Sequence, residues 1–332
     1  GVDYYTVLSI FTHMTFTTIF VTLAIVISNC LILLVISWTK AFKNVNKWFL
    51  LSSTISDLLL GLFVTPFSIF NSLYNSWVFA NDIFCCIEAY VAAALLIAGL
   101  YALAWLQVDH YVAIRKPDRY KYVMSPTRSA CWIGFVWLVS VSFCMPPLFS
   151  LRRARYYREA FICIIEAKQQ RAYFMTAGLL VAGPAISALF YTSFYMFTKA
   201  YKKQLKFYNQ VFVDRASRPL NYKINLINSI IFIGCWLPWC LLRVHHAVVS
   251  RDKRASPEFH FYFLWLGIST AFIKFIVYVC KSKEFRDGLR ESFNVHADNC
   301  DCPRCVPHHN IACTFLSFHS RSINIDNNLY GI

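Results

Sequence analysis

The chain has 332 residues, of which 58% are hydrophobic and only 15% are charged, and its net charge at pH 7 is +15. A soluble domain of this length has about 25% charged residues, so the composition argues against an ordinary water-soluble fold and favours an integral membrane protein. The basic excess is spread over several connecting segments and forms no single patch. It therefore indicates contact with an anionic lipid surface and not with nucleic acid.

Seven apolar segments are long enough to cross a bilayer as helices, which takes about 20 residues. Uncharged stretches cover 4–39, 58–81, 89–108, 129–151, 172–198 and 224–242, and a seventh over 259–280 is interrupted only by Lys274. The second span begins near Trp48 and contains one acid, Asp57. The connections are short and no internal repeat is evident. We therefore expect one all-α integral membrane protein, a seven-transmembrane helix bundle over residues 15–280.

Lysine and arginine in the connecting segments indicate the orientation, because cytoplasmic loops retain more of them. An outside N-terminus places most of them on the inner side, although the basic loop "LRRARYYREA" then lies outside. Residue 1 is glycine and no cationic leader precedes the first span. We therefore expect a truncated extracellular N-terminus over 1–14, insertion directed by the first span, and a multi-pass protein of the plasma membrane.

The segment after the seventh span is amphipathic. In "SKEFRDGLRESF" over 282–293, Phe285, Leu289 and Phe293 recur at i, i+4 and i+8 with basic residues opposite, which predicts a helix on the membrane surface. Residues 294–332 are expected to form a polar cytoplasmic tail. The tail contains three membrane-proximal cysteines: Cys300, Cys302 and Cys305. Their position suits S-palmitoylation and their spacing also resembles zinc ligands, so both interpretations, and no role at all, stay open.

Several spans carry residues that a generic helix bundle does not need. In chain order these are Asn29 in "ISNCLILLV", Asp57 in "SSTISDLLLGLFVTPF", Asp109-His110-Tyr111, Trp137, Pro184, "CWLP" over 235–238, and Tyr278. Their order and spacing over about residues 15–293 resembles the rhodopsin-like (class A) G-protein-coupled receptors. Within that class "SDLLLGLFVTPFSI" and "SPTRSACWIGFVWLVS" resemble amine receptors, whereas "VYVCKSKEFRDGLR" is more similar to a small orphan subgroup allied to them. The resemblance implies a heterotrimeric G protein and an extracellular ligand as partners.

The resemblance also implies a disulfide bond at the outer end of the third span. It pairs Cys85 with a cysteine of the second outer loop, here Cys163. Both positions face an oxidising compartment, and such a bond ties a loop to a helix end. Cys86 is a rival partner, and the alternative is that Cys85 and Cys86 are buried thiols.

The third span ends in Asp109-His110-Tyr111, where the family has Asp-Arg-Tyr and the arginine contacts the G protein. Histidine lacks the long guanidinium fork of arginine and is charged only when a neighbour raises its pKa. The family often has an acid at the inner end of the sixth span, and the matching residue here is Arg218. We therefore expect either elevated basal signalling or poor coupling. In a third interpretation His110 only caps the helix end at the interface.

The seventh span departs from the family's Asn-Pro-x-x-Tyr and reads Lys274-Phe275-Ile276-Val277-Tyr278. A lysine inside a membrane is costly unless it is paired or faces water. The family geometry places it near Asp57, an acid that normally binds sodium. We hypothesise that the Lys274 ammonium group replaces sodium as an intramembrane ion pair. In the alternative, Lys274 extends inward to the membrane interface.

The sixth span retains the family's packing switch. Trp236 and Phe232 are four residues apart and lie on one helix face. With Pro184 and Leu100 they resemble the residues that repack on activation, and Pro238 supplies a kink. For each residue taken alone, an aromatic or apolar core position is an equal explanation.

The ligand pocket differs from that of amine receptors, which hold an ammonium group with an aspartate seven residues after the third-span cysteine. Counting from Cys85 gives Ala92. The family's pocket positions correspond to Ala92, Ala93, Leu96, Thr176, Leu180, Trp239, Leu264 and Ile268, with Arg243, His246 and His260 at the rim. This lining favours an apolar ligand, or an acidic one paired with Arg243, over a biogenic amine. Alternatively, Arg243 is a solvated rim charge, or the second outer loop fills the pocket.

No catalytic Ser/His/Asp set, carboxylate pair, phosphate-binding glycine loop or metal site is evident, so we expect neither an enzyme nor a cofactor. His245, His246 and His260 lack a neighbouring carboxylate cluster. Two rival functions remain: a receptor-like protein that does not couple, and a proton-coupled transporter that uses Asp57 and Lys274. Substrate uptake without nucleotide exchange distinguishes the transporter from the receptor, and a membrane enzyme ranks third.

Overall fold

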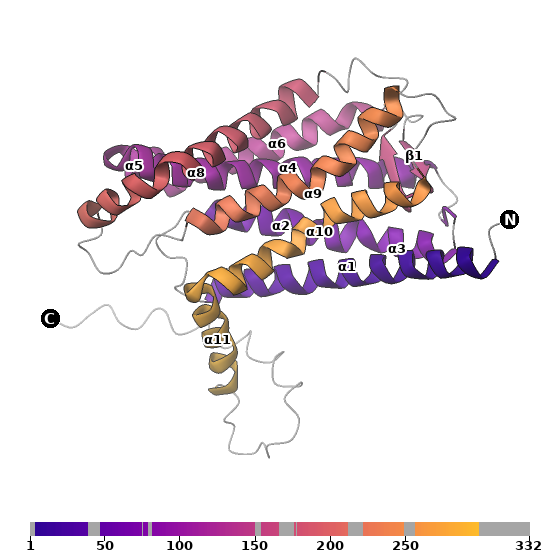
Figure 1. The fold of residues 1–332 in the computed structure, drawn as a ribbon, viewed down its shortest axis with the longest axis horizontal. Helices are drawn as coiled ribbons and strands as arrows, with labels where there is room; N and C mark the ends of the chain where they lie inside the picture. The colour runs from indigo at the N-terminus through magenta and orange to yellow at the C-terminus, as the bar shows by residue number, and fades with distance from the viewer. Residues whose placement is uncertain are drawn as a thin grey trace, which may run out of the picture.

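The computed structural model describes residues 4–38, 47–74, 76–78, 82–149, 154–165, 176, 178–211, 222–248 and 256–298. Long helices lie side by side along one axis (Figure 1). The helices are α1 (Tyr4–Trp38), α2 (Lys47–Phe63), α3 (Thr65–Tyr74), α4 (Asp82–Arg115), α5 (Pro117–Val123), α6 (Pro126–Phe149), α8 (Gly183–Val211), α9 (Tyr222–Val248), α10 (Pro257–Lys281) and α11 (Lys283–Asp298), with a π-helix η2 (Gly178–Ala182) before α8.

Among the described residues, seven helical segments are long and apolar enough to cross a membrane. They are Ser9–Trp38, Lys47–Tyr74, Ile83–Arg115, Pro126–Cys144, Gly178–Thr198, Lys223–His245 and Glu258–Lys281. The seven-helix bundle expected from the sequence is therefore confirmed. The first helix begins at Tyr4 and not near residue 15, because the uncharged stretch already starts there.

Large apolar side chains cover the outside of the bundle. Phe16 on α1 and Phe190, Phe194 and Phe197 on α8 are all exposed. Such a surface is unsuited to water and is the expected one for helices whose solvent is lipid. Inside, several hydroxyl groups bond to carbonyls of their own helix, as Thr18 does to Met14, so these buried hydroxyls are satisfied without breaking the helix.

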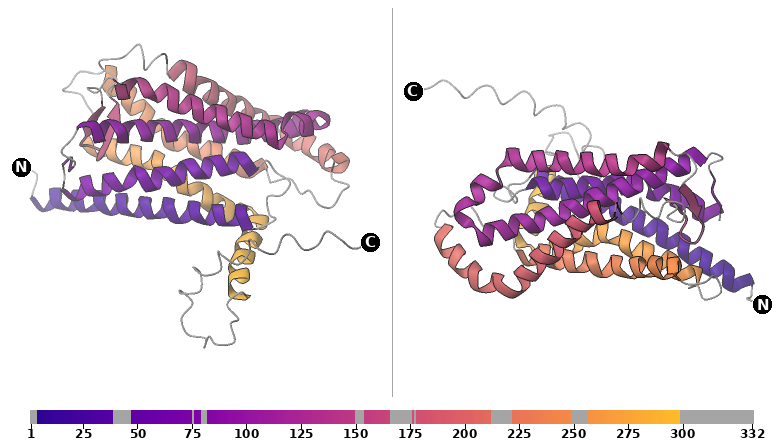
Figure 2. Two further views of the ribbon diagram at one scale, coloured as in Figure 1. Left: turned by 180° about the vertical axis from the view of Figure 1, so that it is seen from behind. Right: turned by 90° about the horizontal axis from the view of Figure 1, so that it is seen from above.

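The central helix is α4, which packs against α2, α6, α8 and α9 (Figure 2). Asn29 and Trp137 are among the side chains that connect neighbouring spans directly. Asn29 on α1 donates to the Ala271 carbonyl on α10 at 3.1 Å, and Trp137 Nε1 on α6 donates to Ser52 Oγ on α2 at 3.0 Å. These bonds hold the inner surfaces of the spans in register.

A short hairpin lies across the end of the bundle near the N-terminus (Figure 1). Strands β1 (Ala154–Tyr157) and β2 (Ile162–Ile165) are antiparallel, with Tyr156 opposite Cys163. The turn between them contains Phe161, whose φ is 58°, a left-handed conformation that is uncommon outside glycine. The sequence analysis expected a loop here and did not predict strands.

At the other end, α11 leaves the bundle at a steep angle (Figures 1 and 2). Ser282 caps its first turn, since Phe285 N donates to Ser282 Oγ at 3.1 Å. Phe285 is buried against Tyr278 and Phe275, with ring centroids 5.6 and 5.8 Å apart, whereas Phe293 is exposed. The helix runs from Lys283 to Asp298, past the expected end at residue 293, and its position at the membrane surface stays a prediction.

Candidate functional site

Asp57 and Lys274 lie side by side inside the bundle. Lys274 Nζ on α10 is 2.6 Å from Asp57 Oδ2 on α2 and also donates to Ser53 Oγ at 3.2 Å. Lys274 is 9% exposed, so its ammonium group is buried within the bundle. Burying two charges costs hydration free energy, which only a close, hydrogen-bonded contact offsets. The pair has such a contact.

A cavity of about 50 Å³ adjoins the pair and is lined by α2, α4, α9 and α10. Gly99 contributes to its space, because a Cβ there would lie 3.2 Å from Ser56 Oγ and 3.7 Å from Asp57 Oδ1. Within the described part of the chain, Asn228 Oδ1 and Trp236 Nε1 are buried and have no hydrogen-bond partner. The volume and these polar atoms suit a few ordered water molecules.

His110 belongs to a hydrogen-bond network that joins three helices at the inner end. Tyr278 on α10 donates to Asn225 Oδ1 on α9 at 3.2 Å, and the Asn225 amide nitrogen lies 3.4 Å from His110 Nδ1 on α4. Gln107 on α4 donates to the Asn225 carbonyl at 3.1 Å and to Ser229 Oγ at 2.8 Å. All five side chains are buried. The network, which we call the inner network, connects α4, α9 and α10 without a guanidinium group.

Asp109 is held by Tyr120, a residue that the sequence analysis did not select. The Tyr120 hydroxyl on α5 donates to Asp109 Oδ1 at 3.1 Å and Oδ2 at 3.3 Å, whereas His110 Nδ1 is 3.9 Å from Asp109 Oδ2. Burial of Tyr120 and the nearby Asp109 carboxylate both raise the Tyr120 pKa well above its usual value, so the hydroxyl keeps its proton. Tyr111 packs edge-on against Tyr191, with ring centroids 5.7 Å apart.

Several residues predicted for the inner side fall outside the part of the chain that the structure describes. These are Arg218 and the tail cysteines Cys300, Cys302 and Cys305. Among the described residues, no group of three or more His, Cys, Asp or Glu side chains is arranged to hold a metal ion.

The proposed switch residues are divided between two environments. Phe232 and Trp236 on α9 lie with ring centroids 6.2 Å apart, and Leu100 on α4 packs in the same cluster as Phe232. The Trp236 indole lies against Gly267 on α10, where a Cβ would come within 2.8 Å of the ring. Pro184, in contrast, is exposed on α8. Among these residues, the closest packing is therefore that of the Trp236 ring on α9 against Gly267 on α10.

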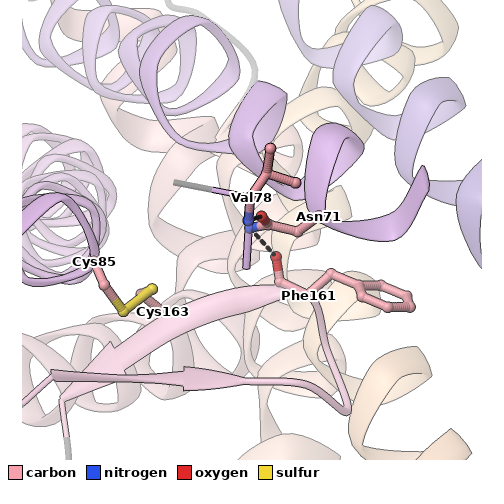
Figure 3. Close-up of a disulfide and its surroundings, with 5 residues drawn as sticks. All are labelled: Asn71, Val78, Cys85, Phe161 and Cys163. Atoms are coloured by element: carbon pink, nitrogen blue, oxygen red, sulfur yellow. Dashed lines mark hydrogen bonds between the residues drawn. A yellow bond between two sulfur atoms is a disulfide. The ribbon is translucent and has the colours of Figure 1, made fainter. Parts of the chain in front are cut away.

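The disulfide implied by the resemblance is present between Cys85 on α4 and Cys163 on β2, with Cα atoms 5.4 Å apart (Figure 3). Cys86 is buried and is not part of this bond. Asn71 on α3 lies close by and donates to the Phe161 carbonyl at 3.4 Å, and its Oδ1 accepts a bond from Val78 N at 3.4 Å (Figure 3). The hairpin is thus fixed to α4 covalently and to α3 by a hydrogen bond.

The turn of the hairpin belongs to the same apolar cluster as part of the expected ligand pocket. Phe161 is 1% exposed and shares one apolar cluster with Ala92, Leu264 and Ile268, against which Leu96 and Trp239 also pack. Ala93 is half-buried on α4 and is not part of this cluster. Leu180, in η2, is 60% exposed on the outer surface, and Thr176 is exposed as well. These two side chains do not reach the cluster around Phe161.

The rim of this region is closed by aromatic contacts. The Tyr157 hydroxyl on β1 is hydrogen-bonded to His260 Nδ1 on α10, and the two rings meet edge to face. The Arg243 guanidinium lies 5.5 Å from the Tyr157 ring centroid and 5.6 Å from that of Trp239, which suits cation–π attraction. Arg243 is thus half-buried over aromatic rings. It is not a fully solvated charge.

The family described as 7 transmembrane receptor (rhodopsin family) matches residues 28–278, and the chain belongs to it. It is therefore a class A G-protein-coupled receptor by family and a multi-pass protein of the plasma membrane, and not an enzyme. Among curated proteins it is 25% identical to the histamine H2 receptor of Rattus norvegicus, over 84% of this chain and 77% of that protein. It is also 25% identical to the alpha-1A adrenergic receptor of Oryzias latipes, over 91% of this chain and 71% of that protein.

Proposed function

We propose that the chain is a receptor that couples to heterotrimeric G proteins and whose outer pocket is filled by its own hairpin. The observation that carries this proposal is the burial of Ala160 and Phe161 in the same apolar cluster as Ala92, Leu264 and Ile268 of the expected pocket. A filled pocket needs no diffusible ligand to bias the bundle toward one state. Signalling in the absence of added ligand is then set by the contacts of the hairpin.

A biogenic amine bound in the usual way does not fit this region. The relatives named above are amine receptors by name, but Ala92 stands where the resemblance predicts an aspartate for the ammonium group. The charged side chain at the rim is Arg243, which packs over the Tyr157 and Trp239 rings and repels a cation. The site therefore favours an apolar or acidic ligand over an amine.

The N-terminus is proposed to lie outside the cell. The start of α1 and the hairpin with the Cys85–Cys163 disulfide are at the same end of the bundle (Figure 1). Disulfide bonds persist in oxidising compartments, so this end faces outward. The inner network and α11 then face the cytoplasm, where G proteins bind.

The test is basal second-messenger output at matched surface expression, in cells expressing the parent chain, Phe161→Ala, or Phe194→Ala. We expect output above that of untransfected cells for the parent, a several-fold decrease for Phe161→Ala, and no change for Phe194→Ala, since Phe194 is exposed on α8. A parent chain whose output is unaffected by Phe161→Ala contradicts the proposal.

A second candidate is a receptor-like protein that does not couple. It is favoured by the burial of His110 within the inner network, because a short imidazole held there cannot reach outward as arginine does. The distinguishing variant is His110→Arg. A silent parent chain that gains output from this substitution supports the second candidate, whereas a parent chain that already signals excludes it.

A further inference from the structure

We propose that the slot holding the hairpin turn is a recognition site for an aromatic peptide segment, so that an external ligand of this receptor is a peptide that imitates Ala160–Phe161. This inference rests on the proposed function, because it takes the hairpin turn as the occupant of the ligand site. It adds the chemical class of the molecule that the site accepts.

Two side-chain donors meet two adjacent main-chain carbonyls of the turn. Trp265 Nε1 on α10 donates to the Ala160 carbonyl at 3.2 Å. Asn71 Nδ2 on α3 donates to the Phe161 carbonyl at 3.4 Å, a bond that Figure 3 shows. Trp265 and Asn71 are themselves buried. Such fixed donors recognise a peptide backbone, because they would remain unsatisfied beside an apolar molecule without carbonyl groups.

An aromatic slot receives the Phe161 side chain. Its ring lies between Phe11 on α1 and Phe261 on α10, with centroid separations of 6.3 and 5.8 Å. The tilted and edge-on geometries are those that aromatic rings prefer. The slot therefore selects an aromatic side chain, and the two donors select the peptide carbonyls beside it.

The left-handed backbone at Phe161 separates this arrangement from ordinary loop packing. A φ of 58° is unfavourable for phenylalanine, and at Phe161 it coincides with a buried ring, a hydrogen bond to the Phe161 carbonyl and another to the adjacent Ala160 carbonyl. Removing the ring of the turn empties the aromatic slot, so that a free peptide competes only with the main chain of the turn for Trp265 and Asn71. The intact chain, in contrast, supplies its own turn at a high effective concentration.

The first test uses toluene as a probe for the slot. Phe161→Ala should lower the melting temperature of the purified receptor by about 5 °C or more, because it leaves a cavity. Toluene should recover most of this loss in a saturable manner, as apolar cavities bind small aromatic molecules. The parent chain and Phe194→Ala should show no such gain. If toluene raises the melting temperature of Phe161→Ala and of Phe194→Ala equally, Phe161 does not occupy an aromatic slot.

The second test uses a synthetic peptide of residues 154–165 with serine in place of Cys163. It should bind Phe161→Ala at least about tenfold more tightly than the parent chain, where the intact turn competes. The same peptide with alanine in place of its phenylalanine should not bind. Adding Asn71→Ala to Phe161→Ala should lower the affinity for the peptide and leave the stabilisation by toluene unchanged. If the peptide binds equally tightly without its phenylalanine, or equally tightly to the receptor with Asn71→Ala, the site does not recognise an aromatic peptide segment.

Both tests measure binding to the purified receptor and need no G protein. If the parent chain proves silent in cells, the proposed function fails, while these measurements still show whether the slot recognises an aromatic peptide segment. Should Phe161→Ala not yield folded receptor, Phe161→Leu keeps part of the apolar volume without a β-branch at the left-handed position, and a smaller toluene gain is expected for it. Folded Phe161→Leu without any toluene gain contradicts the proposal.

Discussion

At the scale of single residues, Lys274 shows how one substitution alters the chemistry of a buried site. An acid within the membrane needs a positive partner, and here α10 supplies one at 2.6 Å from Asp57. Because the partner belongs to the chain, it does not dissociate as a dissolved ion does. We therefore propose that the stability of this receptor is independent of sodium.

The variant Lys274→Met should make the stability of the receptor dependent on sodium. It leaves the Asp57 carboxylate buried without its ammonium partner, which costs about 3–5 kcal/mol of stability for buried pairs. The measurement is the melting temperature of the purified receptor in sodium chloride and in choline chloride. We expect a lower value than for the parent chain, with partial recovery in sodium alone.

The double variant Asp57→Asn with Lys274→Met is the matched control, since it removes both charges. It should be more stable than Lys274→Met in choline chloride and should not respond to sodium. If the single and double variants melt at the same temperature in choline, the ion pair is not the source of the effect.

At the scale of elements, the inner network fastens α4, α9 and α10 where the sequence predicted only weak restraint. Asn225 is its centre, because its amide and carbonyl groups face Tyr278, His110 and Gln107. We propose that a movement of α9 that opens an inner cleft for a G protein breaks these bonds, and that the network takes the place of the ionic contact that the sequence lacks.

Asn225→Leu should loosen the inner turns of α9. The expected result is faster amide hydrogen exchange in the first turns after Tyr222 and several-fold higher basal output, because the buried Tyr278 hydroxyl loses its acceptor, Asn225 Oδ1. Tyr278→Phe should produce the same acceleration, and the two effects should not add, since both remove the same bond.

Thr54→Val serves as the control at this scale. Thr54 is buried on α2, and its hydroxyl bonds to the Leu50 carbonyl of its own helix at 2.8 Å. Its substitution should leave exchange in α9 unchanged. Strictly additive effects of Asn225→Leu and Tyr278→Phe would show that the two residues act separately.

At the scale of the whole molecule, orientation follows from which end carries the disulfide. An epitope placed before residue 1 should be accessible to antibody on intact cells, and one placed after residue 332 should be accessible only after permeabilisation. Accessibility of the C-terminal epitope on intact cells contradicts the proposed topology, and with it the assignment of the hairpin to the outer side.

Much of this architecture is predictable from the sequence, because an uncharged run of about 20 residues or more matches the length of helix that crosses a bilayer. The pairing of Cys85 with Cys163 followed from the family resemblance. The two strands of the hairpin were missed, since the basic segment before Phe161 has the composition of an exposed loop, whereas a second outer loop that fills the pocket was one of the alternatives left open. The burial of Phe161 depends on partners in α1, α3 and α10, which this composition does not reveal. Tyr120 and Asn225 were missed for the same reason: spacing within one helix does not reveal a hydrogen-bond partner on another.

The paired charges in the bundle also bear on how the receptor responds to the voltage across the membrane. A single charge that crosses the membrane field exchanges about 2.3 kcal/mol with a potential of 100 mV. Asp57 and Lys274, 2.6 Å apart, together carry no net charge. The field exerts a torque on this small dipole and no net force, so a change in membrane potential neither drives an ion into the site nor expels one.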